Sequence, residues 1–166
     1  EDPKTAINKM LVNFDRRFDD EMRAAAQEKG YSVRDIVIIA SMIEKETDGT
    51  DQAHIASVIY NRLTNTSAET VGLLGIDATL VYALGRPITQ DDYQTADTPY
   101  NTYKYQGLPP GPISNPGMVA IRAAMNPDST SDYYYVLGND GKHHFFKTLK
   151  GQQDFIAQQQ AEKRSG

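Results

Sequence analysis

The sequence predicts an α+β fold in which helices dominate and one β-hairpin lies near the end of the chain. Apolar residues recur at three- and four-residue steps through the first half, as they do in amphipathic helices. The triplet Asn139-Asp140-Gly141 stands between two short aromatic runs, which is a strong signal for a tight hairpin turn. With 166 residues the chain is long enough for one well-cored domain and too short for two of ordinary size. We therefore expect a single domain over 1–166.

Two helices open the predicted fold. The first is a long amphipathic helix over 1–30, with Pro3 in its first turn and Gly30 beyond its end. The second is capped by Ser32, and its apolar run at 36–43 leaves no polar face. A helix that is apolar all round is buried on all sides. The first helix is therefore expected to be scaffold, and the second to form the centre of the core.

The remaining elements are shorter. The expected helices cover about 52–63, 79–84, 115–126 and 151–163, and Thr89 with Asp92 indicates the cap of another. The expected strands cover 133–137 and 142–147. Residues 95–117 hold five prolines and three glycines, which forbids regular helix or a central strand. A long irregular segment is either functional or disordered. Its three tyrosines and stiff prolines favour an ordered segment.

The composition excludes several classes of protein. The chain has 17 Lys plus Arg against 22 Asp plus Glu, a net charge of −5 without a basic stripe, so nucleic acid is not an expected partner. The absence of cysteine excludes disulfide scaffolds and thiolate chemistry. Three histidines make a three-histidine metal site improbable, and no Gly-rich phosphate loop, GxSxG or HExxH motif occurs. We expect neither a metal nor a cofactor.

Glu44 is the sharpest candidate for acid chemistry. It follows the apolar run, and because helical residues turn by about 100°, it shares a face with Ala40 and Ser41 while Glu46 is rotated about 200° away. A carboxyl at the end of an apolar helix is partly desolvated and meets the negative end of the helix dipole. Both effects favour an acid that keeps its proton near neutral pH, as protonation of a leaving group requires. The alternative is that EKET at 44–47 is only a solvated last turn.

Other polar residues are candidates for binding or for a second acid. Hydrolysis of a glycosidic bond needs a second carboxylate, which Asp77 or Asp97 would supply. The commoner role for Asp77 is to cap the helix that begins at Thr79. Side chains suited to contact a sugar are Asn61, Arg62, Tyr100, Asn101, Thr102 and Tyr103. The same residue types also satisfy loop backbones and helix ends, so both interpretations stay open. His143 and His144 should point to opposite faces of a strand.

Six stretches in order resemble the endolytic murein transglycosylase (YceG-like) family. They are IEKET at 43–47, YNRL at 60–63, IDATLVYALG at 76–85, DTPYNTYKYQGLPPGPISNPG at 97–117, AIRAAMNP at 120–127 and KHHF at 142–145. The resemblance covers about 32–153 and implies a helix-rich, lysozyme-like catalytic core. It divides the single domain into a leading helix at 1–30, a family-like core at 31–153 and a C-terminal helix or tail at 154–166.

The resemblance implies a reaction on peptidoglycan. Members of this family cut the MurNAc–GlcNAc β-1,4 bond within glycan strands without water, which terminates or trims nascent strands. The family's catalytic glutamate matches Glu44, which would protonate the glycosidic oxygen and then take a proton from the MurNAc C6 hydroxyl. That hydroxyl attacks C1 and leaves a 1,6-anhydro end, so no second catalytic carboxylate is needed. The substrate contacts that it implies are Asn61, Arg62, Asp77, Thr79, Tyr100, Asn101, Tyr103, Pro110, Asn115 and His143.

The chain departs from the family pattern in two places. Many relatives have LQTDPT where this chain has LGIDAT at 74–79, so Gly75 stands in place of a glutamine and a polar contact is lost. Near the end, Gln152 and Gln153 replace a common His-Asn pair. Neither change touches Glu44, so they bear on the substrate cleft rather than on activity.

The family also implies a cellular setting. Its members are typically anchored by one N-terminal transmembrane helix, followed by a small LysM-like region. No window of this chain approaches 18 apolar residues, so we expect an excised catalytic domain whose parent faces the extracytoplasmic side of a bacterial membrane. The expected partners are glycan strands and, for the parent, peptidoglycan synthases and other elongation or division proteins. Two rival functions are a non-catalytic glycan-binding or scaffold module and a muramidase that uses water.

Overall fold

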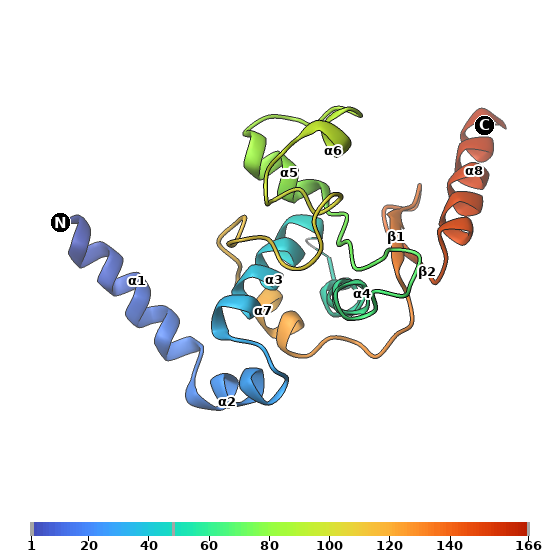
Figure 1. The fold of residues 1–166 in the computed structure, drawn as a ribbon. Helices are drawn as coiled ribbons and strands as arrows, with labels where there is room; N and C mark the ends of the chain where they lie inside the picture. The colour runs from blue at the N-terminus through green and yellow to red at the C-terminus, as the bar shows by residue number, and fades with distance from the viewer. Residues whose placement is uncertain (1, 48, 166) are drawn as a thin grey trace.

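The computed structural model describes residues 2–47 and 49–165, and the α+β prediction is confirmed (Figure 1). Within these residues helices alternate with long loops, and one two-stranded sheet lies near the C-terminus. The elements are α1 (Pro3–Arg17), α2 (Asp20–Glu28), α3 (Val33–Glu46), α4 (Gln52–Thr64), α5 (Asp77–Leu84), α6 (Asp92–Thr95), α7 (Met118–Met125), β1 (Tyr134–Leu137), β2 (His143–Phe146) and α8 (Leu149–Ser165). None of the described helices is long and apolar enough to cross a membrane.

Helix α3 lies at the centre of the core, with α4 and α7 packed against it. Ser32 and Asp35 form a reciprocal capping box that starts the helix, as the sequence predicts. Every residue from Ile38 to Ile43 is buried. Each large aliphatic side chain buried in this way contributes about 1.5–3 kcal/mol relative to exposure. The C-terminal end of α3, which includes Glu44 and Glu46, is therefore firmly placed.

The prediction of one continuous helix over 1–30 is wrong. The chain breaks after α1 because Phe18 is fully buried in the core, where its ring lies 5.5 Å from that of Phe14. The Asp19 side chain then caps α2 by accepting a hydrogen bond from the backbone N–H of Met22. Burial of one aromatic ring and a strong N-cap together outweigh the helical periodicity of the sequence.

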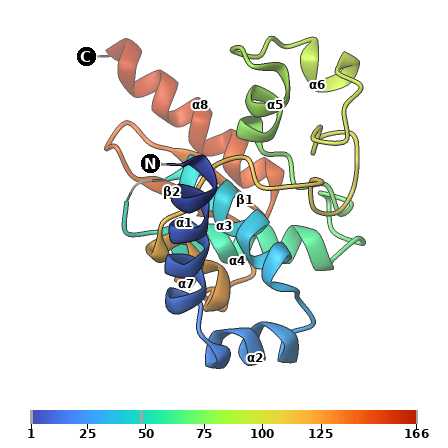
Figure 2. The same cartoon turned by 90° about the vertical axis from the view of Figure 1, so that its left-hand side faces the viewer.

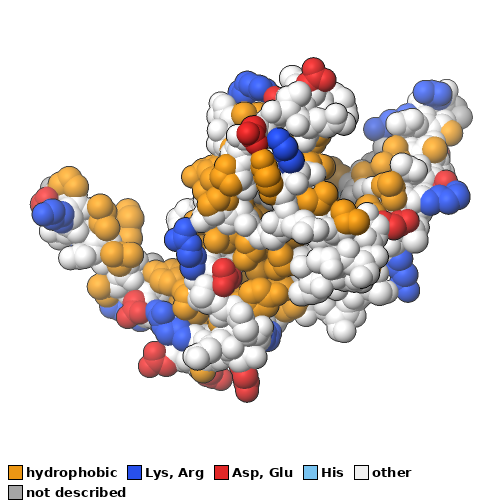
Figure 3. Space-filling model, viewed as in Figure 1, with side chains coloured by type: hydrophobic (Ala, Val, Ile, Leu, Met, Phe, Trp, Pro, Cys, Tyr) orange, Lys and Arg blue, Asp and Glu red, His pale blue; other side chains and the backbone are white. Residues whose placement is uncertain are grey.

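Helix α1 projects from the body of the molecule in Figure 1, and in Figure 2 it lies in front of the body because this side faces the viewer. None of its residues is buried. Figure 3 shows apolar side chains gathered along this helix, where Ile7, Met10 and Leu11 are all exposed. The core is thus built by the elements from Phe18 onward.

The hairpin confirms the predicted turn at 139–141. β1 and β2 pair in antiparallel register, with Tyr135 opposite Phe145 and Leu137 opposite His143. These side chains share one face, and the Phe145 ring stacks on His54 of α4 at 3.5 Å. On the other face His144 stacks on Phe155 of α8, so the two adjacent histidines point in opposite directions as predicted. The hairpin therefore lies between α4 and α8 and brings Tyr135 towards the end of α3.

The proline-rich segment at 95–117 is irregular and ordered, as predicted. It crosses α3, where the N–H of Ile113 donates to Ser41 Oγ at 3.0 Å and the hydroxyl of Ser114 donates to the Ser41 carbonyl. Near its start, the Thr102 carbonyl accepts a hydrogen bond from the N–H of Gly75. The segment thus connects the helical core to the loop that precedes α5.

Candidate active site

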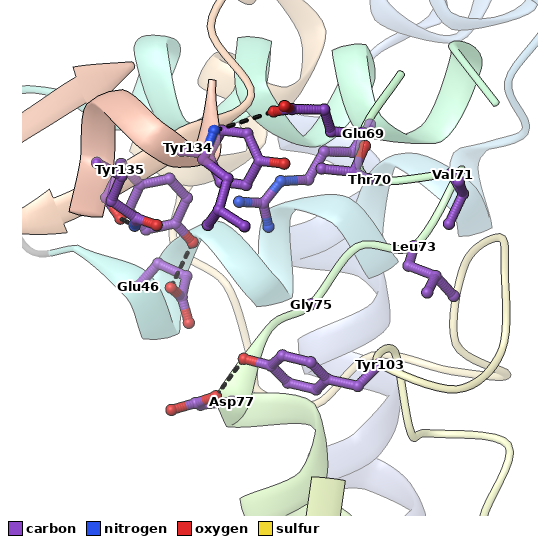
Figure 4. Close-up of a pocket in the computed structure, with 13 residues that line it drawn as sticks. Glu46, Glu69, Thr70, Val71, Leu73, Gly75, Asp77, Tyr103, Tyr134 and Tyr135 are labelled. Carbon is purple, nitrogen blue, oxygen red and sulfur yellow. Dashed lines mark hydrogen bonds between the residues drawn. The ribbon is translucent and has the colours of Figure 1, made fainter. Parts of the chain in front are cut away.

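Two hollows open at the C-terminal end of α3, and Glu46 lines both of them. The first has a volume of about 480 Å³, and Figure 4 shows side chains from α3, α5, the hairpin and the loops around it. Its polar lining consists of Glu46, Arg62, Glu69, Thr70, Asp77, Tyr103, Tyr134, Tyr135 and Gln152. The second has a volume of about 760 Å³, and its polar lining includes Glu44, Lys45, Asp51, Lys142 and His143. Clefts with a few convergent polar groups are the usual place for a binding site.

Glu46 is the last residue of α3, and its carboxyl lies in the first hollow. The Tyr135 hydroxyl of β1 donates a hydrogen bond to Glu46 Oε2. Burial raises the pKa of the Glu46 carboxyl above its usual range. The Tyr135 hydrogen bond opposes that rise, while the negative charge of Asp77 adds to it. Glu46 is therefore the carboxyl of the site that keeps its proton more readily than an ordinary glutamate.

Glu44 lies on the exposed side of the same turn, whereas the sequence predicts a partly desolvated carboxyl at this position. Its Oε2 accepts a hydrogen bond of 3.0 Å from the N–H of Gly117. Gly117 is the N-cap of α7 and has no side chain that could cap it, so Glu44 satisfies this helix end. Glu44 and Glu46 have different partners, as the predicted rotation requires. Because Tyr135 of the hairpin contacts Glu46, the position of the hairpin determines that Glu46 rather than Glu44 is shielded from solvent.

The raised pKa of Glu46 implies that the free energy of unfolding depends on pH. We expect the free energy of unfolding of the wild-type chain to fall, relative to that of Glu46→Gln, as the pH rises from about 5 to about 8. The folded state holds this proton more tightly than the unfolded chain, in which a Glu pKa is about 4.3. The resulting stabilisation is present below the unfolded pKa and is lost as the pH rises through the folded pKa. Glutamine does not titrate, so the Glu46→Gln chain lacks this contribution to the pH dependence.

Urea unfolding of both chains at the two pH values measures this effect. A difference in unfolding free energy that stays the same at pH 5 and pH 8 would contradict the assignment of a raised pKa to Glu46.

Arg62 is fixed in the wall of the first hollow. Its side chain is largely buried, its Nε donates to the Tyr133 carbonyl at 2.6 Å, and its Nη1 donates to the Leu74 carbonyl. The guanidinium also lies over the rings of Tyr134 and Tyr135, 5.6 and 5.7 Å from their centroids. Arg62 therefore joins α4, the hairpin and the loop before α5, and it brings a positive charge close to Glu46.

Asp77 does not cap α5, so the role considered commoner for it is wrong. It is the first residue of the helix, and the N-cap, Ile76, forms no side-chain cap. The Asp77 carboxylate accepts hydrogen bonds from two phenols, Tyr103 on Oδ1 and Tyr93 on Oδ2 at 3.3 Å. The two rings meet edge to face with their centroids 4.6 Å apart. Asp77 is thus held at the first hollow by side chains rather than by its own helix.

Three predicted substrate contacts hold the fold together instead. The Asn61 amide donates to the carbonyls of Thr130 and Asp132. Asn101 is fully buried, and its amide donates to two backbone carbonyls just upstream. Thr79 is also fully buried, and its hydroxyl donates to the Ile76 carbonyl. In each case a polar side chain satisfies backbone groups that would otherwise be buried without partners.

Three further predicted contacts lie elsewhere. The Tyr100 ring lies 5.2 Å from that of Tyr82, and the Pro110 carbonyl accepts a hydrogen bond from Arg34. Asn115 lines a separate hollow against α1. None of these three lines either hollow at the end of α3. The predicted residues that the structure brings together are Glu44, Arg62, Asp77, Tyr103 and His143.

His143 lies in the second hollow beside the Glu46 region. Its Nδ1 is 2.7 Å from Asp51 Oδ2, and its ring meets that of Tyr135 edge to face at 5.7 Å. Among the residues that the structure describes, no group of three or more His, Cys, Asp or Glu is arranged to hold a metal ion.

Several residues of the first hollow were missed by sequence reasoning. Tyr135 covers Glu46, and Gln152 donates to the Tyr135 carbonyl at 2.6 Å. Thr70 Oγ1 is buried and has no hydrogen-bond partner in the described part of the chain. Val71 has φ +46°, a conformation that costs a β-branched residue about 1–3 kcal/mol. An unsatisfied hydroxyl and a strained backbone at a rim are typical of a binding site, and neither has a signature in the sequence.

Comparison with known proteins identifies the family. The model of the YceG-like family matches residues 1–158. The chain is 36% identical over 155 residues to the endolytic murein transglycosylase of Bacillus subtilis (strain 168), covering 90% of this chain and 42% of that protein. It is 32% identical over 141 residues to the endolytic murein transglycosylase of Streptococcus pneumoniae serotype 2, covering 80% and 24%.

A solved structure agrees with these matches. The crystal structure of a putative yceG-like protein from Listeria monocytogenes superposes with a TM-score of 0.81 at 36% identity, covering 93% of this chain and 50% of that one. The chain spans less than half the length of the curated relatives that it matches. The shared sequence and the shared fold show that this chain belongs to the YceG-like family.

Proposed function

We propose that this chain is the catalytic domain of an endolytic peptidoglycan lytic transglycosylase. It cleaves the MurNAc–GlcNAc β-1,4 bond within glycan strands and leaves 1,6-anhydro-MurNAc ends, which terminates or trims nascent strands. The observation that carries this proposal is the carboxyl of Glu46, whose pKa is raised and which lies in a hollow of about 480 Å³ lined by tyrosines. The relatives from B. subtilis and S. pneumoniae, named endolytic murein transglycosylases, support it.

Glu46 is the proposed proton donor. Its carboxyl proton passes to the glycosidic oxygen as the bond from that oxygen to C1 of MurNAc breaks. The carboxylate left behind, which accepts the hydrogen bond from Tyr135, then takes the proton of the MurNAc C6 hydroxyl. The C6 oxygen bonds to C1, so the acid is restored and no water is consumed. A nucleophile already tethered to the substrate has a high effective concentration.

Glu44, whose role as the acid was implied by the family resemblance, is the other candidate for the proton donor. It lines the second hollow, so substrate that fills both hollows would reach it. Its exposure and its contact with the N-terminus of α7 favour a structural role. The catalytic role of Glu44 stays a prediction, and paired substitutions of the two glutamates separate the candidates.

A hydrolytic muramidase is the second candidate function. The observation that favours it is the presence of Asp77 in the same hollow as Glu46, because hydrolysis uses a pair of carboxyls. A non-catalytic glycan-binding module is favoured less, since binding alone does not need a half-buried carboxyl that is hydrogen-bonded to Tyr135. Incubation of this chain with purified peptidoglycan and mass spectrometry of the products separates all three functions.

The proposal extends to location and partners. Peptidoglycan strands lie on the extracytoplasmic side of the bacterial membrane, so the parent protein would hold this domain there through a transmembrane anchor. Peptidoglycan synthases and other proteins of elongation or division, which supply the nascent strands, are the proposed protein partners. No metal or cofactor takes part in the proposed reaction.

A further inference from the structure

The second hollow carries positive charge to which the proposed reaction assigns no role. Two lysines line it, Lys45 in the last turn of α3 and Lys142 directly before β2. Both side chains are exposed, and within residues 2–47 and 49–165 neither ammonium group has a hydrogen-bond or ion-pair partner. Each ammonium group offers three N–H donors and no acceptor. The two lysines can therefore bind an anion that enters the hollow.

The carboxylates of the same hollow already have partners within the fold. Glu44 and Glu46 each accept a hydrogen bond from another element. One oxygen of Asp51 accepts a hydrogen bond of 2.6 Å from the Thr47 hydroxyl, and the other lies 2.7 Å from Nδ1 of His143. A ligand can therefore engage the two lysines without displacing a contact that holds these elements together.

The hairpin adds an apolar side chain to this hollow. Leu137 of β1 lines it and is 61% exposed. The glycan backbone of peptide-bearing peptidoglycan has no charge, because the lactyl carboxyl of each MurNAc is joined to the peptide as an amide. Its stem peptide, in contrast, carries free carboxylates and the methyl side chains of alanine. Two cations beside an exposed leucine are therefore complementary to the peptide rather than to the sugars.

The shape of the substrate places the stem peptide close to this hollow. The stem is joined through the lactyl group to O3 of MurNAc, the ring whose C1 is attacked in the proposed reaction. It therefore leaves the sugar near the carboxyl that gives the proton. The two hollows meet at the C-terminal end of α3, where Glu46 lines both and Glu44 lines the second. A branched substrate bound there has its stem beside the second hollow whichever glutamate is the acid.

We propose that the second hollow is a stem-peptide subsite, in which Lys45 and Lys142 bind the free carboxylates of the peptide and Leu137 contacts its methyl groups. This inference rests on the proposed function and names the class of strand on which the chain acts. Strands whose stem carboxylates are free are bound better than strands in which these groups are amidated. An amide keeps nearly the same shape and loses the negative charge.

The chain offers a matched control in Lys147. This lysine directly follows β2, its side chain is exposed, and it lines neither hollow. Lys147→Ala therefore removes the same charge from the same hairpin without changing the proposed subsite. It corrects for any general effect of net charge on the attraction of an anionic substrate.

The first test compares peptide-bearing strands with the same strands after carbodiimide coupling to ammonia, which converts their carboxylates to amides. The release of new MurNAc ends gives kcat and KM for each, and thermal unfolding checks each variant. Because an exposed ion pair changes an equilibrium constant by up to about fivefold, the wild type should prefer the free carboxylates by up to about tenfold. Lys45→Ala and Lys142→Ala should each reduce this preference about two- to fivefold.

The kinetic constants distinguish binding from a structural role. A contact made equally in the bound substrate and in the transition state changes KM and leaves kcat unchanged. The preference should therefore disappear through KM in the double variant, survive in Lys142→Arg, which keeps the charge, and survive in Lys147→Ala. A preference that persists in the double variant, or that falls equally in Lys147→Ala, would overturn the inference.

A measurement that needs no cleavage separates this inference from the proposed function. The probe is a soluble disaccharide tripeptide with free carboxylates, titrated into nitrogen-15-labelled wild-type chain and followed by NMR. The backbone amide signals of Leu137 and Lys142 should shift, less so in about 0.5 M salt, which screens the charges. Equal shifts with the amidated probe, or none at these residues, would overturn the subsite. Absence of cleavage of both kinds of strand by the wild type would instead contradict the proposed function, and the titration would still test the subsite.

Discussion

Glu46→Gln is expected to slow the cleavage of peptidoglycan by this chain at least about a hundredfold, whereas Glu44→Gln keeps the rate within about threefold of the wild type. The amide has almost the shape of the acid and still meets the Tyr135 hydroxyl, but it has no proton to give to the glycosidic oxygen. At position 44 the amide oxygen can still accept the hydrogen bond from Gly117, so the contact between α3 and α7 survives.

The measurement is the rate of fragment release from purified peptidoglycan, with thermal unfolding of each variant to confirm that it is folded. The two variants control for each other because they change the same residue type two positions apart on one helix. Activity lost in Glu44→Gln and kept in Glu46→Gln would return the proton donor to Glu44, the position that the family resemblance implies. Equal loss in both would contradict a single proton donor at either position.

Much of the fold was predictable because it follows from local sequence. The apolar run of α3 and the Ser32 cap specify a buried helix without reference to the rest of the chain. The hairpin follows from its turn triplet, where Gly141 takes φ +73°. The break after α1 was not predictable in this way, since it depends on the burial of Phe18 against distant helices.

The candidate site was predicted only in part, for a related reason. Helix geometry correctly separates Glu44 from Glu46, but it cannot say which side is covered. That depends on Tyr135, which stands 89 residues beyond Glu46 in the sequence. A similar limit applies to Asn101. An asparagine in a polar loop looks the same in the sequence whether its amide binds a ligand or the backbone of its own loop. A side chain that hydrogen-bonds to the backbone can be told from one that binds a ligand only when the positions of the backbone carbonyls are known.

The largest difference between the candidate functions lies in the new ends of the glycan. We expect essentially all new MurNAc ends made by this chain to be 1,6-anhydro ends, about one water lighter than reducing ends. A reaction run in oxygen-18 water should leave these ends unlabelled, because their C6 oxygen comes from the substrate. The control is a hydrolytic muramidase acting on the same peptidoglycan, which must incorporate the label.

The tyrosine contacts of Asp77 are the physical basis for this expectation. A water-using enzyme needs a second carboxylate about 5 to 9.5 Å from the acid, free either to attack C1 or to activate water. Asp77 and Glu69 share the first hollow with Glu46, and both oxygens of Asp77 already accept hydrogen bonds from phenols, so neither is free for these roles. The C6 hydroxyl needs no such partner because it is tethered beside C1. Labelled reducing ends would show that Asp77 serves hydrolysis, and the transglycosylase mechanism would then be withdrawn for this chain.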